Sequence, residues 1–140
     1  MGIKRLDNIA IVVESLDEAI SFFELLGMKL HGRAFIEGDF ADIAVELEGI
    51  KSEIAVLETP DGHSRIELSQ YLNPPPIAQQ PPAQNALGVH RLMFNVDDID
   101  QTLADLGAEP INGIAQYQET YRLSYLRGPS GIILALAQDI

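Results

Sequence analysis

The chain of 140 residues contains no cysteine. Disulfide bonds, thiolate catalysis and cysteine metal ligands are therefore excluded, and this absence leads us to expect a cytoplasmic protein. Positive charge is scarce, since 9 Lys and Arg face 21 Asp and Glu and leave a net charge of −12. Phosphate backbones repel so acidic a chain, so we expect no nucleic-acid partner. Long apolar runs are also missing: the longest, Ile132–Ala137, has six residues, too few to span a membrane, and we expect no membrane partner.

What remains is the composition of an ordinary soluble globular protein, with 46% hydrophobic and 21% charged residues. The length suits one domain, or two small similar halves that share a core.

The first half opens on a strand followed by a helix. Leu6–Val13 is rich in Ile and Val and is predicted to be a buried strand. Ser15 follows as a helix cap, Glu18 completes a capping box, and Gly27 stands where the helix ends.

The same signals return in the second half. Val89–Val96 is predicted to be a strand, Asp97 and Asp98 lead into a helix, and Gly107 ends it. Equivalent residues lie 83 positions apart, in the pairs Asn8 and Arg91, Val13 and Val96, and Asp17 and Asp100. We predict the other strands at Met28–Ile36, Glu53–Glu58, Arg65–Tyr71, Ile111–Gln118, Tyr121–Arg127 and Ile132–Ala137, with Phe40–Glu48 as a short helix or a strand. The pattern indicates an α+β fold of two duplicated βαβββ modules.

A proline-rich connector separates the two modules. Residues 73–87 carry five prolines, which exclude a helix or a central strand. We therefore predict one domain over residues 1–140, made of a first module at 1–72, the connector at 73–87 and a second module at 88–140.

The chain resembles the vicinal oxygen chelate (VOC) superfamily, which includes glyoxalase I, bleomycin-resistance proteins, fosfomycin-resistance enzymes and extradiol dioxygenases. The resemblance covers nearly the whole chain and rests on LDNIAIVVESLDEAISFFELLGM, GVHRLMFNVDDIDQTLADLGAE and YLRGPSGIILALAQ. It implies that the modules curl into an incomplete barrel around a central cleft. In enzymes of the superfamily this cleft holds a divalent metal, and several members are dimers, so we expect a homodimer.

The resemblance also implies four metal-ligand positions, usually His, Glu, His and Glu. This chain has Asn8, Glu67, Arg91 and Ala135 there. Ala135 offers no donor and Arg91 would place a fixed positive charge beside the ion, so we expect no metal and no cofactor.

An alternative register places His90 in the cleft instead of Arg91. Glu67 and His90 would then belong to a rearranged site for Zn, Ni, Mn or Fe. Strand alternation opposes this register: if Leu92 and Phe94 face the helix, His90 faces it too and Arg91 points into the cleft.

The residues expected to contact a ligand are Asn8, Arg91, Met93, Tyr121 and Tyr125, the last by its match to a cleft tyrosine of fosfomycin-resistance enzymes. We predict that Glu67 and Arg91 form a charge pair where the metal would lie, either as a purely structural pair or as part of a site. In the functional version Arg91 holds a carboxylate or phosphate, Glu67 acts as general base, and Tyr121 or Tyr125 donates to the developing oxyanion.

We thus expect a small-molecule-binding protein with a degenerate metal site. Three alternatives stay open: a metal-independent lyase or isomerase with Glu67 and Tyr125 as catalytic residues, a divalent-metal-dependent lyase, isomerase or dioxygenase that uses Glu67, and a resistance-type protein that sequesters its ligand. Whether the chain is an enzyme at all is open at this point.

Overall fold

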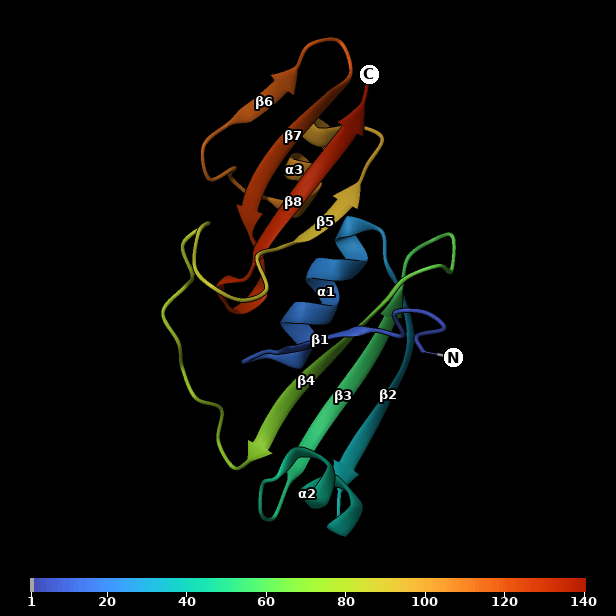
Figure 1. The fold of residues 1–140 in the computed structure, drawn as a ribbon, viewed down its shortest axis with the longest axis vertical. Helices are drawn as coiled ribbons and strands as arrows, with labels where there is room; N and C mark the ends of the chain where they lie inside the picture. Colours follow the sequence, from blue (N-terminus) through green and yellow to red (C-terminus); the bar gives the residue numbers. More distant parts are fainter. Residues whose placement is uncertain (1) are drawn as a thin grey trace. The chain divides into compact units, whose positions relative to one another are not determined.

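The computed structural model describes residues 2–140. The chain forms two units that meet in sequence between Ala78 and Gln79, inside the proline-rich connector. Each unit has one four-stranded sheet with a helix against one face (Figure 1). No helix within the described residues is long and apolar enough to cross a membrane.

The first unit has the sheet order β1-β4-β3-β2, in which β1 runs parallel to β4 and the other pairs are antiparallel. Its elements are β1 (Ile9–Val12), α1 (Leu16–Leu26), β2 (Lys29–Glu37), α2 (Asp39–Val45), β3 (Lys51–Glu58) and β4 (Arg65–Asn73).

The second unit repeats this topology with the order β5-β8-β7-β6, and β5 is parallel to β8. Its elements are β5 (Leu92–Asn95), α3 (Ile99–Leu106), β6 (Ile114–Tyr117), β7 (Tyr121–Arg127), the short 3-10 helix η1 (Pro129–Gly131) and β8 (Ile133–Asp139). The predicted α+β fold of two βαβββ units is confirmed.

Local sequence signals define both main helices. The Ser15 hydroxyl accepts a hydrogen bond from the Glu18 N–H (3.2 Å), and Gly27 ends α1 at φ 117°. In the second unit the Asp98 carboxylate accepts from the Gln101 N–H (3.0 Å), and Gly107 ends α3 at φ 61°. These caps lie where the sequence predicted them.

A glutamine from β4 and one from β8, the last strands of the two units in sequence order, each bind the first turn of the helix in their own unit. The Gln70 side-chain oxygen accepts from the backbone N–H of Leu16 (2.7 Å), and the Gln138 oxygen accepts from that of Ile99 (2.9 Å). Because the first N–H groups of a helix have no partner within the helix, each glutamine supplies an acceptor to a buried donor that would otherwise be unsatisfied.

The core of each unit lies between its helix and its sheet. The helix side chains that pack there are Leu16, Ala19, Ile20 and Phe23 in α1 and Ile99 and Leu103 in α3. The buried strand residues include Ala55, Leu57, Ile66 and Leu68 in the first unit and Leu126, Leu134 and Leu136 in the second.

The structure decides one alternative that the sequence left open, and it shortens the opening strands. The segment around Phe40 forms the helix α2, so the first unit has a helix that its counterpart lacks among the described residues. The opening strands are shorter than predicted, because a strand extends only as far as its partner pairs with it: β1 begins at Ile9, and Leu6 is 75% exposed.

Candidate functional site

The sheet of the second unit has a face on the side opposite α3, which we call the open face of that sheet; Ala135 on this face is buried, whereas Met93 is accessible. Arg122 and Gln138 mark the covered face, since both contact α3 at Asp100 and Ile99. Side chains alternate between the two faces along a strand. The cross-strand row formed by Met93, Ala135 and Tyr125 therefore lies on the open face.

The first unit has an equivalent open face. Ala10 pairs with Glu67, and Glu67 pairs with Val56, in one row across β1, β4 and β3. The neighbouring residues Ile66 and Leu68 are buried towards α1, so Glu67 points the other way and is half-buried.

The duplicated topology relates the four family ligand positions in pairs. Glu67 pairs with Ala10 in the first unit as Ala135 pairs with Met93 in the second. Asn8 and Arg91 each stand just before the opening strand of their unit. At these positions the first unit therefore carries an amide and a carboxylate, and the second unit carries a guanidinium and a methyl group.

Arg91 contacts Tyr125 in two ways. Its guanidinium Nη1 donates a hydrogen bond to the Tyr125 hydroxyl oxygen, and its Cζ lies 5.6 Å from the centre of the Tyr125 ring. A guanidinium over an aromatic face is a favourable cation–π contact. Arg91 thus lies on the open face, as predicted, although its position before β5 means that its contacts with Tyr125 rather than alternation establish this.

His90 lies beside the same tyrosine, which the sequence argument did not anticipate. Its ring stacks on Tyr125, with centroids 5.7 Å apart and planes at 25°. Its Nε2 is hydrogen-bonded to the side-chain oxygen of Gln84 from the connector. The alternation that assigned His90 to the helix side is wrong, because β5 begins at Leu92 and alternation does not extend to residue 90.

Met93 and Tyr121 also lie on the open face and are accessible, with 43% and 38% of their surface exposed. The Tyr121 ring stacks on Tyr117, its cross-strand partner, with centroids 5.6 Å apart. Further along, the Asn95 amide donates to Asp139 (3.4 Å). This end of the face is aromatic and polar, whereas the Arg91 end is cationic.

Arg122 belongs to the opposite face from the three tyrosines. Its guanidinium binds Asp100 (3.3 Å) and the Gln138 side chain (3.3 Å) on the α3 side. Its role is to tie the helix to the sheet.

Asn8 is exposed, and its amide donates to the neighbouring Asp7 carboxylate (3.2 Å). Asn8 and Glu67 belong to one unit and Arg91 to the other. The Glu67–Arg91 charge pair would join the two units, and it stays a prediction.

The residues predicted for the four family ligand positions do not have the chemistry of a usual metal site. They bring one carboxylate and one amide, together with a positive charge at Arg91. Within each unit, over residues 2–140, no three His, Asp or Glu side chains gather closely enough to hold an ion.

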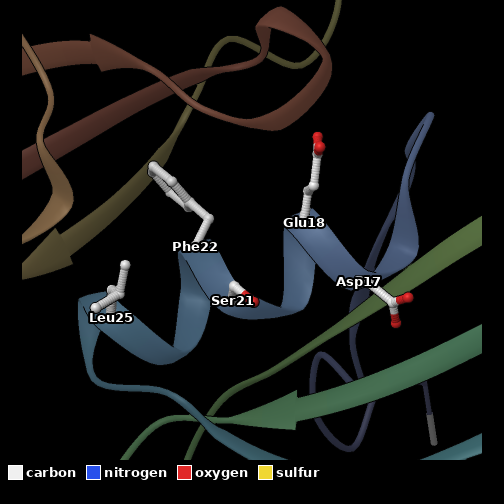
Figure 2. Close-up of a pocket in the computed structure, with 5 residues that line it drawn as sticks. All are labelled: Asp17, Glu18, Ser21, Phe22 and Leu25. Carbon is white, nitrogen blue, oxygen red and sulfur yellow. The ribbon is translucent and has the colours of Figure 1, made fainter.

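A shallow hollow lies on the outer face of α1 (Figure 2). It is lined by Asp17, Glu18, Ser21, Phe22 and Leu25. Figure 2 shows Glu18 and Phe22 directed away from the strands of their own sheet. The Asp17 carboxylate is already bound by Arg33 (2.8 Å). The predicted site residue Glu67 lies on the far face of that sheet, so the hollow is a separate feature.

Comparison with known proteins gives consistent relatives. A glyoxalase family protein from Bacillus cereus is 49% identical, covers 100% of this chain and 97% of its own, and superposes with a TM-score of 0.94. The uncharacterized protein YaeR of Escherichia coli (strain K12) is 26% identical over 99% of both chains.

One further solved structure supports the fold alone. It is a mutant of the genomically encoded fosfomycin resistance protein FosX from Listeria monocytogenes, complexed with Mn(II) and 1S,2S-dihydroxypropylphosphonic acid. It is 14% identical, covers 99% of this chain and 95% of its own, and has a TM-score of 0.63. The sequence model of one family matches residues 5–136. The chain belongs to the Glyoxalase/Bleomycin resistance protein/Dioxygenase superfamily.

Proposed function

We propose that this protein binds a small molecule through an oxyanion, a carboxylate or a phosphate, which Arg91 and Tyr125 hold without a divalent metal. The observation that carries the proposal is the set of contacts that the Arg91 guanidinium makes. Within the second unit, Arg122 is ion-paired with Asp100, whereas Arg91 and Arg127 have no carboxylate partner; Arg127 donates to the Gly131 carbonyl, and Arg91 binds the neutral Tyr125 hydroxyl on the open face. In a chain with 21 acidic residues, such an arginine keeps its charge available.

The net charge of −12 favours a cationic ligand, and the local geometry favours an anionic one. We give the local geometry more weight, because salt at physiological strength screens exposed charges beyond roughly 8 Å, while a bound oxyanion would touch the guanidinium directly.

The hydrogen-bond directions suit this chemistry. A guanidinium has five N–H donors in a planar fork, and Arg91 uses Nη1 on Tyr125. Because the Tyr125 oxygen accepts that bond, its own proton is left to donate to the ligand. Met93 and Tyr121 offer accessible surface for the rest of the molecule, and Asn8 would contact it from the first unit.

Glu67 is the candidate catalytic base. With Arg91 holding the oxyanion, the Glu67 carboxylate would remove a proton alpha to a carbonyl, and Tyr125 would donate to the oxygen that becomes negative. This is metal-independent lyase or isomerase chemistry on a degenerate metal site. The row of Ala10 and Val56 beside Glu67 supports the assignment, since small apolar neighbours leave the carboxylate accessible from the open face.

The binding test is a calorimetric titration with benzoate and sulfate. We expect binding, with an affinity loss of about 10–100-fold in Arg91→Ala, since a hydrogen bond to a charged group contributes about 1.5–3 kcal/mol. Arg5→Ala removes an exposed arginine of the first unit and serves as the matched control, with unchanged affinity expected. Equal affinities in wild type and Arg91→Ala would contradict the proposal.

Elemental analysis tests the metal-free part. Purified protein should carry no stoichiometric Zn, Ni, Mn or Fe. One ion per chain, lost in Glu67→Gln and in His90→Gln, would instead establish the rearranged metal site. Product analysis on any bound metabolite then separates turnover from sequestration, and binding without turnover would remove Glu67 from a catalytic role for that ligand.

We also propose a homodimer. Three large apolar side chains of the consecutive elements β2 and α2, Phe35, Phe40 and Ile43, are 67–87% exposed, and exposed apolar side chains are candidates for an interface. Sedimentation equilibrium should give twice 15.3 kDa at micromolar concentration. A single 15.3 kDa species at every concentration would contradict this.

A further inference from the structure

The open face of the second sheet has another end, away from Arg91, where two aromatic rings stand beside a carboxylate. In one row across β8, β7 and β6, Asp139 is paired with Tyr121, and Tyr121 is paired with Tyr117. This row lies on the same face as Tyr125, because Tyr121 stands four residues before Tyr125 on β7 and alternate residues share a face. We call these three residues the acidic–aromatic end of the open face.

The side chains of the acidic–aromatic end are accessible. The rings of Tyr117 and Tyr121 stack with centroids 5.6 Å apart, yet 56% and 38% of the two residues' surfaces are exposed. Asp139 is exposed as well, and its carboxylate receives one long hydrogen bond, from the Asn95 amide (3.4 Å). In residues 79–140 no positively charged side chain is paired with Asp139, so its charge is available to a ligand.

This combination of groups suits a protonated amine. An ammonium group is attracted both to the face of an aromatic ring and to a carboxylate. The Tyr121 ring and the Asp139 carboxylate come from paired residues of neighbouring strands, whose Cβ atoms stand about 5 Å apart. Asn95 adds an acceptor, since its Nδ2 is the atom that donates to Asp139 and its Oδ1 is left over. The acidic–aromatic end and the Arg91 end therefore favour opposite charges.

The sheet fixes the separation of the two ends. Ala135 and Tyr125 belong to the row at the Arg91 end, and Asp139 lies four residues beyond Ala135 along β8. At about 3.4 Å per residue, the two rows are about 13 Å apart. Between them on this face, β8 carries Ala137, whose methyl group is too short to stand as a barrier between the two ends.

We propose that the ligand is an extended zwitterion, which places its oxyanion on Arg91 and a protonated amine on Asp139 and Tyr121, about 13 Å away. This inference rests on the proposed oxyanion site and adds the chemistry of the other end of the ligand. It also reconciles the local geometry with the net charge of −12, because a zwitterion has no net charge for the chain to repel.

The test is titration calorimetry with peptides that differ only in their charged ends. Tetraglycine carries both charges and spans about 13–14 Å when extended, N-acetyl-tetraglycine keeps only the carboxylate, and diglycine carries both charges too close together. At about pH 6.5 an α-amino group is protonated. We expect tetraglycine to bind about 3–30-fold more tightly than either other peptide, as an exposed ion pair and a cation–π contact together would give. At about pH 9.5 the amine is neutral, and its advantage over N-acetyl-tetraglycine should disappear.

Variants locate the amine. Asp139→Asn and Tyr121→Leu should each reduce the preference for tetraglycine over its acetylated form. Asp105→Asn removes the same charge from an exposed position of α3 and is the matched control, in which the preference should persist. Arg91→Ala should weaken both peptides alike and also keep the preference, because it removes only the oxyanion contact. Thermal unfolding checks that each variant is folded.

The outcomes separate this inference from the function on which it rests. If no carboxylate probe binds, benzoate included, or if Arg91→Ala binds them as wild type does, the proposed function is wrong. If the carboxylates bind but tetraglycine gains nothing over N-acetyl-tetraglycine, the function stands and the amine site is wrong. A preference that survives in Asp139→Asn, or that falls equally in Asp105→Asn, would overturn the amine site as well.

Discussion

We expect the side chain of Gln70, which binds the first turn of α1, to contribute measurably to the stability of the protein. In Gln70→Ala, the backbone N–H of Leu16 loses the acceptor that lies 2.7 Å away. Leu16 is 1% exposed, so water has little access to replace that acceptor. A buried donor left unsatisfied costs about 1–3 kcal/mol. We therefore expect the free energy of unfolding to fall by that amount, and Tm to fall by about 2–4 °C per kcal/mol.

The assay is urea unfolding followed by circular dichroism, with the midpoint compared at a constant m-value. Gln70→Glu keeps an acceptor at the N-terminus of α1, where negative charge is favourable, and should stay within about 1 kcal/mol of wild type. Gln80→Ala, at an exposed connector glutamine, is the matched control and should be neutral. A Gln70→Ala protein within about 0.3 kcal/mol of wild type would refute the reasoning.

Three further predictions concern the first unit and its counterpart. Gly27 lies at φ 117° and Gly107 at φ 61°, and a Cβ would meet nothing within 4 Å at either place. An Asn residue adopts a φ near 61° far more readily than one near 117°. Urea unfolding should therefore show a larger fall in the free energy of unfolding for Gly27→Asn than for Gly107→Asn. Phe23 is fully buried, and Phe23→Ala should lower the free energy of unfolding by about 3–5 kcal/mol in the same assay. The hydrogen bond from the Thr59 hydroxyl to Asp61 (2.6 Å) lowers the pKa of that carboxyl, so an NMR titration should find its midpoint below the ordinary value and Thr59→Val should raise it. Because this pKa is lowered by folding, its contribution to stability is present above the unfolded pKa and disappears as pH falls through the folded one; an unchanged midpoint in Thr59→Val would contradict the assignment.

The fold was predictable because its signals are local. Ser15 and Asp98 cap the helices, Gly27 and Gly107 end them, and the repeat at 83 positions indicates one topology used twice. The sequence could not decide between a helix and a strand for the segment that forms α2. Its apolar residues Phe40, Ile43 and Leu47 are 38–87% exposed, so their spacing does not indicate which face is buried.

The site was predictable only in part, because period-two alternation applies inside a strand and not before it. Met93 and Tyr125 lie within β5 and β7, and their common face follows from the register. His90 stands outside β5, and its place beside Tyr125 depends on a side-chain contact with Gln84 six residues away. A glutamine in a proline-rich connector carries no sequence signal for such a role.

The pairing of β1 with β4 and of β5 with β8 means that every backbone ladder closes inside its own half of the chain. A protease that nicked residues 74–78 would therefore cut no strand pairing. The two fragments would each keep the strand pairings of their own sheet. Added peptide at this point would likewise leave both ladders whole, which makes the stretch a natural place to insert a tag or a reporter.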